Sequence, residues 1–438
     1  MNKKQILLVS FMLFSLFFGA GNLIFPPLLG ALSGKNMWIS IIGFVVTAVI
    51  LPVLGVIVVS KFKGLQNLGK KVHPLFGIVF TFLIYLSIGP GLGIPRAASV
   101  PFEMAISPYL LDNNLTWLYL LIFSLVFFAI VYILAINPKK LVNRIGKVLT
   151  PALLMLIIFL FVSSLFGQGH EVLDPVGNYV NNPFVQGFLD GYLTMDTIAA
   201  LNFGLIISNT ILSFGVTEEK QTNYILVCAS FAGLILTSIY IMLSYLGMEY
   251  SSIVIGAENG AVILRAISQS LFGTFGAVLL ATIFTLACLT TCIGLVTSIS
   301  QFFESQFPKI KYKHYVLVIT LFSFGICNFG LNTLLKFSVP LLDLIYPISI
   351  CLIFLGLFDR FYKNNKFIYP VTISIVFLMS FFYVLRTLGV NYGAFGNFLE
   401  KIPLFKSGLG WVLFALGSVI VTIPLGYIFK KNEPVLEN

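Results

Sequence analysis

A succession of apolar runs, each about long enough to cross a lipid bilayer, constrains this chain more than any other feature. A helix that crosses the bilayer needs ~20 mostly apolar residues, and short polar segments separate the runs. The twelve runs are residues 6–29, 37–60, 72–99, 115–136, 148–166, 189–214, 224–247, 273–300, 315–331, 334–357, 367–385 and 409–429. Charged residues make up 10% of the chain, against ~25% in a soluble domain. The sequence therefore excludes a water-soluble enzyme and predicts an all-α polytopic membrane protein with 12 transmembrane helices.

The basic residues fall mainly on one side of this topology. The chain carries 26 Lys+Arg and a formal net charge of +10. If the N-terminus lies in the cytoplasm, 19 of the 26 basic residues fall on cytoplasmic segments, as the positive-inside rule requires. We therefore expect both termini in the cytoplasm. The positive charge is interpreted as an orientation signal, and nucleic acid is not an expected partner.

The residues that usually carry enzyme or metal chemistry are sparse. The five cysteines lie inside apolar runs, where no disulfide framework is indicated. Cys288 and Cys292 share a helix face without a neighbouring histidine or carboxylate, so we interpret them as packing residues. His73, His170 and His314 fall in loops, and the chain contains neither an HExxH motif nor a paired-aspartate prenyl-transfer motif. The sequence predicts that the chain is not an enzyme.

The first apolar run is interrupted near its middle by Gly19-Ala20-Gly21-Asn22, and Pro26 and Pro27 follow. Glycines allow a helix to unwind, and the prolines are expected to stop it. Non-helical backbone at membrane depth is tolerated only where it lines a protein-enclosed cavity. The segment is therefore a candidate binding site. A helix-packing motif is the alternative, because glycine is common in membrane helices.

The sixth run contains an ionisable residue, Asp196, close to Thr194, Thr197 and Asn202. A carboxyl group in an apolar span is costly unless it faces a polar cavity. We therefore predict a functional role for Asp196. The alternative is a structural hydrogen bond to a neighbouring helix.

The two interrupted runs are the first and the sixth of the twelve. This spacing fits two five-helix halves related as an inverted repeat, an architecture that places binding sites at broken helices near the bilayer midplane. We expect a single membrane transporter domain over 1–438, with a first repeat at 1–166, a second at 188–357 and two further helices at 367–429. The repeat is inferred from the positions of the breaks, because the halves show no clear residue-level identity.

Two adjacent hydroxyl residues, Thr290 and Thr291, lie in the eighth run. Such hydroxyls often bond back to the carbonyl four residues earlier. Because the two point in different directions, they are also candidates to bind a cation with carbonyl groups of the first run. Hydroxyl and carbonyl oxygens suit a hard cation.

Three isolated charged residues, Arg96, Asp190 and Asp343, complete the set of candidates as gate or coupling groups. Arg96 follows three glycines and two prolines in the third run. It either neutralises Asp190, Glu103 or Asp196 in an outer gate or extends to the membrane interface. Asp343, in the tenth run, is a candidate coupling group or a tie between helices.

Three motifs together resemble the bacterial branched-chain amino acid:cation symporters (LIVCS family). They are GAGNLIFPP from Gly19 to Pro27, GPGLGIPR from Gly89 to Arg96, and GYLTMDTIAA from Gly191 to Ala200. The resemblance covers the whole chain. That family is grouped with transporters of the LeuT-type five-plus-five fold, so the resemblance implies discontinuous first and sixth helices.

The comparison with LeuT-like transporters implies particular ligands. The stretch ACLTT, from Ala287 to Thr291, is similar to a motif of their eighth helix whose last two hydroxyls bind sodium. The implied sodium ligands are Thr290, Thr291 and the carbonyls of Ser15, Phe18 and Ala287. The implied substrate-binding residues are Gly19, Ala20, Gly21, Asn22, Leu193, Thr194 and Asp196. Asp196 departs from the small hydroxyl residue of that fold, which leaves room for a proton-linked or amine-binding role.

The resemblance thus implies a secondary transporter of the bacterial plasma membrane that imports leucine, isoleucine and valine by symport with Na⁺, or with H⁺. The substrate carboxylate would meet N–H groups of residues 19–22 at a half-helix N-terminus, and the ammonium would meet carbonyls near Leu193–Asp196. A permease of the same fold for another amino acid or a nucleobase is the alternative. The expected partners are the amino-acid substrate and the lipid bilayer, with no obligatory protein partner and no cofactor beyond the coupling ion.

Overall fold

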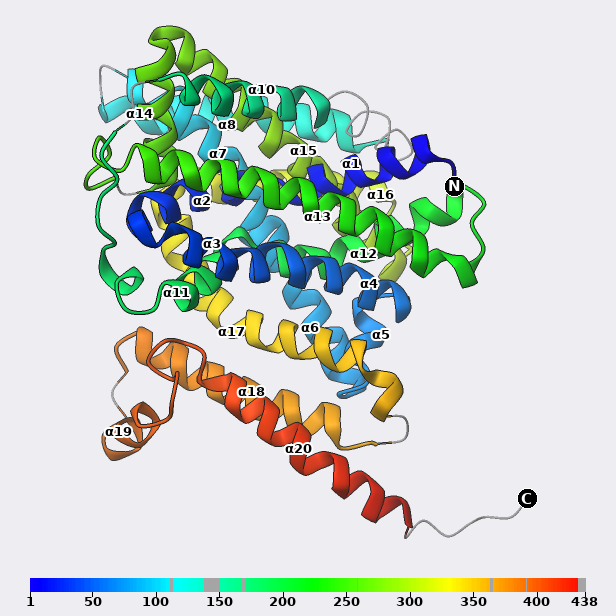
Figure 1. The fold of residues 1–438 in the computed structure, drawn as a ribbon. Coiled ribbons are helices and arrows are strands. Elements are labelled where there is room, and N and C mark those ends of the chain that lie inside the picture. Colours follow the sequence, from blue (N-terminus) through cyan, green and yellow to red (C-terminus); the bar gives the residue numbers. More distant parts are fainter. Residues whose placement is uncertain are drawn as a thin grey trace. The chain divides into compact units, whose positions relative to one another are not determined.

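The computed structural model describes residues 1–110, 113–137, 150–167, 170–257, 259–362, 365–390 and 392–431. Over these residues the chain forms helices joined by turns and short loops, with no β-strand (Figure 1). Eight helical stretches are long and apolar enough to cross a membrane, judged by length and composition. The all-α membrane fold expected from the sequence is confirmed, and the count of twelve spans stays a prediction.

The cytoplasmic location of both termini also stays a prediction. It rests on the distribution of basic residues along the sequence. Five of the basic residues assigned to the cytoplasmic side lie outside the described residues: Lys139, Lys140, Arg144, Lys147 and Lys363.

Contacts between helices divide the chain into two compact units. The first comprises Met1–Ile57 and Tyr85–Ser338, and the second comprises Val58–Ile84 and Val339–Asn438. Three helices contribute residues to both units: α4 (Leu51–Lys61), α6 (Pro74–Leu86) and α17 (Leu331–Leu357).

The first unit contains the helices that contribute residues to the candidate site, together with other helices. They are α1 (Lys3–Phe17), α2 (Ala20–Ser33), α3 (Met37–Val45), α7 (Gly93–Ala105), α8 (Thr116–Ala135), α10 (Thr150–Leu165), α11 (Pro183–Asp190), α12 (Asp196–Ser213), α13 (Glu218–Glu249), α14 (Gly260–Phe272), α15 (Thr274–Gln306) and α16 (Tyr312–Cys327). Helix α13 packs along α1 and α2, and α15 packs against α7 (Figure 1).

The contact between α2 and α13 is close because each helix contributes a glycine. A Cβ atom on Gly30 would overlap the carbonyl oxygen of Ser244, and one on Gly247 would overlap the carbonyl oxygen of Pro27. Small residues let membrane helices approach in this way. The contact holds α2 against the helix that carries Tyr240.

Three interruptions of helical backbone shape the first unit. The first falls between α1 and α2, at Gly19. The second is the π-helical segment Ser87–Gly91 between α6 and α7, where Gly89 has non-helical angles (φ −87°, ψ −121°). The third is the 3₁₀ turn Gly191–Thr194 between α11 and α12, followed by Met195 with φ of 68°. Each interruption exposes backbone groups that a continuous helix would use internally.

Pro26 and Pro27 lie inside α2, so the prediction that they stop the helix is wrong. Helix α2 continues beyond both prolines to Ser33. A proline removes one N–H donor and frees a carbonyl of the preceding turn, but membrane helices tolerate this where neighbouring groups satisfy the freed backbone. The break falls before the prolines, at Gly19.

The second unit contains α5 (Leu65–Gly69), α18 (Ile368–Thr387), α19 (Ala394–Glu400) and α20 (Gly410–Lys431), with parts of the shared helices. Helices α18 and α20 lie side by side (Figure 1). The hydroxyl of Ser418 donates to Oγ1 of Thr372 at 3.0 Å between them. A polar contact also joins α18 to the segment after α17, where the hydroxyl of Tyr369 donates to Oδ1 of Asp359 at 2.8 Å.

Candidate functional site

The break between α1 and α2 is closed by a side chain rather than by helical hydrogen bonds. In a continuous helix the N–H of Gly19 would donate to the carbonyl of Ser15. Here it donates to Oδ1 of Asn22 at 2.9 Å. The carbonyl of Ser15 is thereby released from its helical role, and Asn22 caps the N-terminus of α2 from within.

The break between α11 and α12 contains a strained residue. Met195 adopts a left-handed conformation (φ 68°, ψ 10°), which costs a side-chain-bearing residue roughly 1–2 kcal/mol. Its N–H donates to the carbonyl of Tyr192 at 3.0 Å, and its carbonyl accepts from the N–H of Ala199 at 2.9 Å. The turn therefore ends abruptly, and Asp196 becomes the first residue of α12.

Asn22, Asp196 and Tyr240 form a buried cluster that joins the two breaks. Nδ2 of Asn22 donates to Oδ2 of Asp196 at 2.6 Å, and the hydroxyl of Tyr240 donates to the same oxygen at 2.8 Å. Asn22 Nδ2 also donates to the Tyr240 hydroxyl oxygen. The three residues are 1%, 2% and 0% exposed. Tyr240, on α13, was not among the residues singled out from the sequence.

Arg96 lies in the same region and is buried. Its side chain is 3% exposed, and Nη1 donates to the carbonyl oxygen of Leu193 at 2.9 Å. Its Cζ lies 5.8 Å from the centre of the Phe25 ring. A Cβ on Gly21 would lie 2.9 Å from Nη2. Arg96 thus lies between the two breaks, close enough to Asp196 for their charges to interact.

The other two carboxylates predicted as gate or coupling groups lie elsewhere. Asp190 ends α11 and accepts a hydrogen bond at Oδ1 from Nε2 of Gln186, at 2.8 Å, and another from the hydroxyl of Tyr179. These partners, not Arg96, satisfy its carboxylate. Asp343 belongs to α17, within the second unit.

The hydroxyl pair of α15 meets the released carbonyl of α1. Oγ1 of Thr290 and Oγ1 of Thr291 each lie 3.3 Å from the carbonyl oxygen of Ser15. Thr290 Oγ1 also donates to the carbonyl of Ala287 at 2.8 Å. Phe18 follows α1 directly, and its ring stacks on that of Tyr240.

The Ser15 hydroxyl oxygen is buried and has no hydrogen-bond partner within the described part of the chain. The possible cation ligands here are all neutral oxygen atoms: the hydroxyl and carbonyl of Ser15 and the hydroxyls of Thr290 and Thr291. Oxygen ligands of this kind fit a hard cation. Groups of three or more His, Cys, Asp or Glu placed to hold a metal are absent from the residues that the structure describes. All five cysteines are free and buried.

A small cavity, here called the junction cavity, opens where the two breaks meet. Its volume is about 40 Å³. The backbone of Gly19, Ala20 and Gly21 lines it together with five polar residues, Asn22, Arg96, Thr194, Asp196 and Thr291. Its apolar lining includes Leu16, Phe17, Ile88, Ala97, Met195 and Leu295. Eight of the predicted site residues thus meet at one cavity, with polar groups beside an apolar wall.

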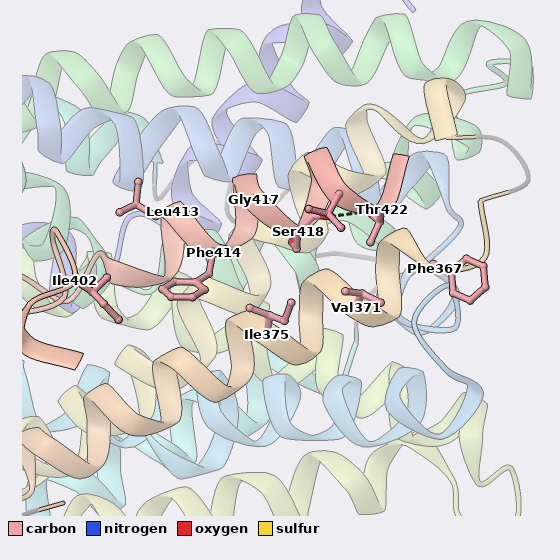
Figure 2. A pocket seen from close by; sticks show the side chains of 10 residues that line it. Phe367, Val371, Ile375, Ile402, Leu413, Phe414, Gly417, Ser418 and Thr422 are labelled. Carbon is pink, nitrogen blue, oxygen red and sulfur yellow. Dashed lines mark hydrogen bonds between the residues drawn. The ribbon is translucent and has the colours of Figure 1, made fainter. Parts of the chain in front are cut away.

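The second unit contains a larger cavity of about 630 Å³ between α18 and α20 (Figure 2). Figure 2 shows Phe367, Ile375 and Phe414 among its lining side chains. Of the described residues that line it, only Ser418 and Thr422 are polar and none is charged. It therefore contains no charged group, and the junction cavity is the better candidate site.

Comparison with known proteins places the chain in a family. Residues 2–432 match the model of a family described as "Branched-chain amino acid transport protein". The chain is also 40% identical over 440 residues to the branched-chain amino acid permease BrnQ of Bacillus subtilis (strain 168), with 98% of each chain covered. The family is one of transport proteins, not of enzymes.

Solved transporter structures share the fold. One is Mhp1, a nucleobase-cation-symport-1 family transporter in a closed conformation, with a TM-score of 0.62, 14% identity, and coverage of 99% of this chain and 94% of that chain. Another is a substrate-bound, outward-open Na⁺-coupled sialic acid symporter, with a TM-score of 0.60, 13% identity, and coverage of 96% and 89%. At these identities the likeness shows the fold alone, which is that of LeuT-type transporters.

Helix composition, fold and relatives agree. Eight apolar helical stretches and the bacterial permease relative together indicate a multi-pass protein of the bacterial plasma membrane. Because residues 2–432 match the family model, this chain belongs to the branched-chain amino acid transport protein family.

Proposed function

We propose that this chain is a secondary transporter that imports leucine, isoleucine and valine by symport with Na⁺. One observation supports the proposal: the junction cavity is lined by Gly19, Ala20 and Gly21 at the start of α2, by Arg96 and Asp196, and by an apolar wall. Arg96 also donates to the nearby carbonyl of Leu193. An amino acid with a branched aliphatic side chain has the matching groups. The name of the Bacillus subtilis permease points to the same substrates.

The substrate carboxylate would lie at the N-terminus of α2. The first N–H groups of a helix lack internal partners and carry partial positive charge, so they favour an anion. The ammonium group would lie on the side of the second break, near the carbonyls of Leu193 and Thr194 and near Asp196. The carboxylate and the ammonium group of the substrate would then both be bound by backbone groups that the breaks expose.

The branched side chain would occupy the apolar wall of the junction cavity. The wall residues come from α1, from the π-helical segment before α7, from α7 itself, from Met195 just before α12 and from α15. Selectivity among the three substrates should be modest, because one methylene in a hydrophobic site is worth only ~1–3 kcal/mol. A cavity of about 40 Å³ is far below the ~300 Å³ of a ligand pocket, so the site must widen when the substrate enters.

Na⁺ would bind between α1 and α15, at the carbonyls of Ser15, Phe18 and Ala287 and the hydroxyls of Thr290 and Thr291. This position is adjacent to the substrate break, because a Cβ on Gly19 would lie 3.0 Å from Oγ1 of Thr291. A cation that ties α1 to α15 would therefore also fix the backbone that holds the substrate. Asp196 is the group that would carry a proton if H⁺ takes part.

The architecture that we propose for this mechanism has twelve spans and cytoplasmic termini. Helices α1 and α2 would form the discontinuous first span, and α11 and α12 the discontinuous sixth. The repeats would cover 1–166 and 188–357, with two further helices at 367–429 in a single transporter domain. Such inverted repeats place the broken helices together at the bilayer midplane.

Uptake into proteoliposomes tests the proposed substrates. Purified protein should take up radiolabelled leucine, and excess isoleucine or valine should compete strongly. Lysine and uracil should compete weakly or not at all. Absence of leucine uptake, or its abolition by uracil, would contradict the proposed function and favour a permease for another amino acid or a nucleobase.

A further inference from the structure

A groove separate from the junction cavity lies between the end of α7 and the first half of α15. Its volume is about 540 Å³, and it is here called the α7–α15 groove. Ala105, the last residue of α7, and Tyr109, in the turn Ser107–Tyr109 that follows, line one side of it. Residues of α15 line the other side. The groove therefore lies along two helices that also carry residues of the candidate site.

The α15 side of the groove is a single stripe of that helix. It consists of Val278, Ala281, Thr282, Thr285 and Leu286, and steps of three and four residues place these side chains on one face. Three of the five are small, which leaves the stripe recessed. Oγ1 of Thr282 donates to the carbonyl oxygen of Val278 at 2.8 Å, so this hydroxyl is satisfied within the helix. The stripe thus offers a mainly apolar channel.

The groove opens to the outside of the protein. Val278 is 62% exposed, and α15 is one of the helices apolar enough to cross a membrane. The surroundings of such a helix are lipid acyl chains. The channel on α15 is therefore accessible from the bilayer, and an acyl chain is the chemical group that matches its lining.

A positive charge lies beside one end of the groove. Cζ of Arg265, on α14, lies 5.7 Å from the centre of the ring of Tyr109, which is itself a lining residue. A cation–π contact of this length uses the charge of the guanidinium but not its five N–H donors. The acidic residue of α7, Glu103, interacts with the side chain of Ser107. An anion at Arg265 would therefore adjoin the end of the groove at Tyr109.

Arg265 and Tyr109 are expected at the edge of the bilayer. Helix α14 has 13 residues, fewer than the ~20 that a crossing helix needs, and α15 begins at Thr274, directly after it. Tyrosine is enriched at membrane–water interfaces. From this edge the stripe on α15 leads toward the hydrocarbon interior. The groove thus joins a cation at the interface to an apolar channel deeper in the membrane.

We propose that the α7–α15 groove binds an anionic phospholipid, with its phosphate at Arg265 and one acyl chain along the stripe of α15. A guanidinium forms charge-assisted, often bidentate hydrogen bonds with a phosphate. A zwitterionic phospholipid brings an ammonium group that competes for its own phosphate, so an anionic headgroup is preferred. The bound lipid contacts the helices that carry Arg96 and Thr290. The proposal does not depend on which substrate the protein transports.

Native mass spectrometry of the purified full-length protein tests the headgroup. The protein is mixed with equal amounts of phosphatidylglycerol and phosphatidylcholine that have identical acyl chains. One phosphatidylglycerol should be retained roughly tenfold over phosphatidylcholine, as expected for one hydrogen bond between charged groups. Arg265→Gln should bring this ratio close to one. The control is Arg386→Gln, whose Nε lies 3.1 Å from Oε1 of Glu400, and which should keep the ratio of the unmodified protein.

A second variant tests the acyl chain. Ala281→Leu places a larger side chain in the stripe and should reduce the retention of both lipids. Ala129→Leu makes the same change at an exposed position of α8 and should retain them normally. Phosphatidylglycerol with a photoreactive group on its acyl chain should label α15 within 278–286 in the unmodified protein and not in Ala281→Leu.

Several outcomes would overturn the proposal. One is equal retention of the two lipids by the unmodified protein, which decides the question even if Arg265→Gln does not fold. Another is an unchanged ratio in a folded Arg265→Gln variant. Displacement of phosphatidylglycerol by glycerol 3-phosphate would assign Arg265 to a soluble phosphate instead. A dimer that is lost in Ala281→Leu, without any change in lipid retention, would assign the groove to a second copy of the chain.

Discussion

Nδ2 of Asn22 lies 2.6 Å from Oδ2 of Asp196, so the residue that caps α2 contacts the residue that begins α12. The two helix breaks, 174 residues apart in the sequence, are therefore joined by one buried hydrogen bond to a carboxylate. A change at either break reaches the other through this contact.

Asp196→Asn is expected to reduce leucine uptake roughly tenfold, because it alters the side chain that accepts the buried hydrogen bonds of Asn22 and Tyr240, each worth ~0.5–1.5 kcal/mol. Uptake into proteoliposomes, normalised to the protein inserted, measures the effect. Asp174→Asn is the matched control, since that carboxylate is 80% exposed in its pair with Lys35. Normal uptake by Asp196→Asn, with the same pH dependence as the unmodified protein, would limit Asp196 to a structural role.

Tyr240→Phe removes the hydroxyl of Tyr240 and keeps its ring, so it tests the hydroxyl alone. The variant keeps the ring contacts with Phe18 and Phe44 but loses the donor to Asp196. Leucine affinity should fall by up to roughly tenfold, as expected for the loss of one buried hydrogen bond worth ~0.5–1.5 kcal/mol. Tyr245→Phe, on the same helix against Phe161, should bind leucine normally. If both variants behave alike, the hydroxyl has no part in the site.

Gly21→Ala should abolish leucine uptake without removing the protein from the membrane. The added Cβ would lie 3.1 Å from Cα of Thr194 and 3.2 Å from the carbonyl oxygen of Leu193, both backbone atoms of the opposite break. Neither can move as a flexible side chain does. Gly325→Ala is the control, because a Cβ there meets no atom within 4 Å. Normal uptake by Gly21→Ala would show that the two breaks need not lie so close.

Thr291→Ala tests the cation ligands. Loss of one oxygen donor to a charged ion should raise the sodium concentration for half-maximal leucine uptake roughly tenfold, with transport restored at high sodium. Thr282→Ala is the control on the same helix, since Thr282 Oγ1 donates to the carbonyl of Val278 at 2.8 Å. Equal sodium dependence in the two variants would remove Thr291 from the site.

The sequence predicted the positions where helical backbone is interrupted near the site. Glycine near residue 19 and an aspartate at 196 are local signals, because each changes what a membrane helix can satisfy by itself. The hydroxyls of Thr290 and Thr291 were predicted to approach carbonyl groups of the first run, and both lie 3.3 Å from the carbonyl oxygen of Ser15. The prediction that Pro26 and Pro27 stop the helix was wrong, because a helix packed against neighbours tolerates prolines.

The partners of the charged residues could not be predicted from the sequence. Tyr240 is an ordinary residue in an apolar helix, and only the packing of α13 against α1 and α2 brings it to Asp196. Arg96 is close enough to Asp196, one of its predicted acidic partners, for their charges to interact, but its hydrogen bond to the carbonyl of Leu193 was not predicted. A backbone carbonyl has no signature in the sequence, and its exposure depends on how the turn before α12 folds.

Leucine accumulation driven by one ion gradient at a time is the most direct test of the central claim. Proteoliposomes are given either an inward sodium gradient or an inward proton gradient, and internal leucine is compared with the external concentration. The account predicts accumulation above equilibrium with the sodium gradient alone. Accumulation with the proton gradient alone, or equilibration without accumulation in both cases, would contradict sodium-coupled symport.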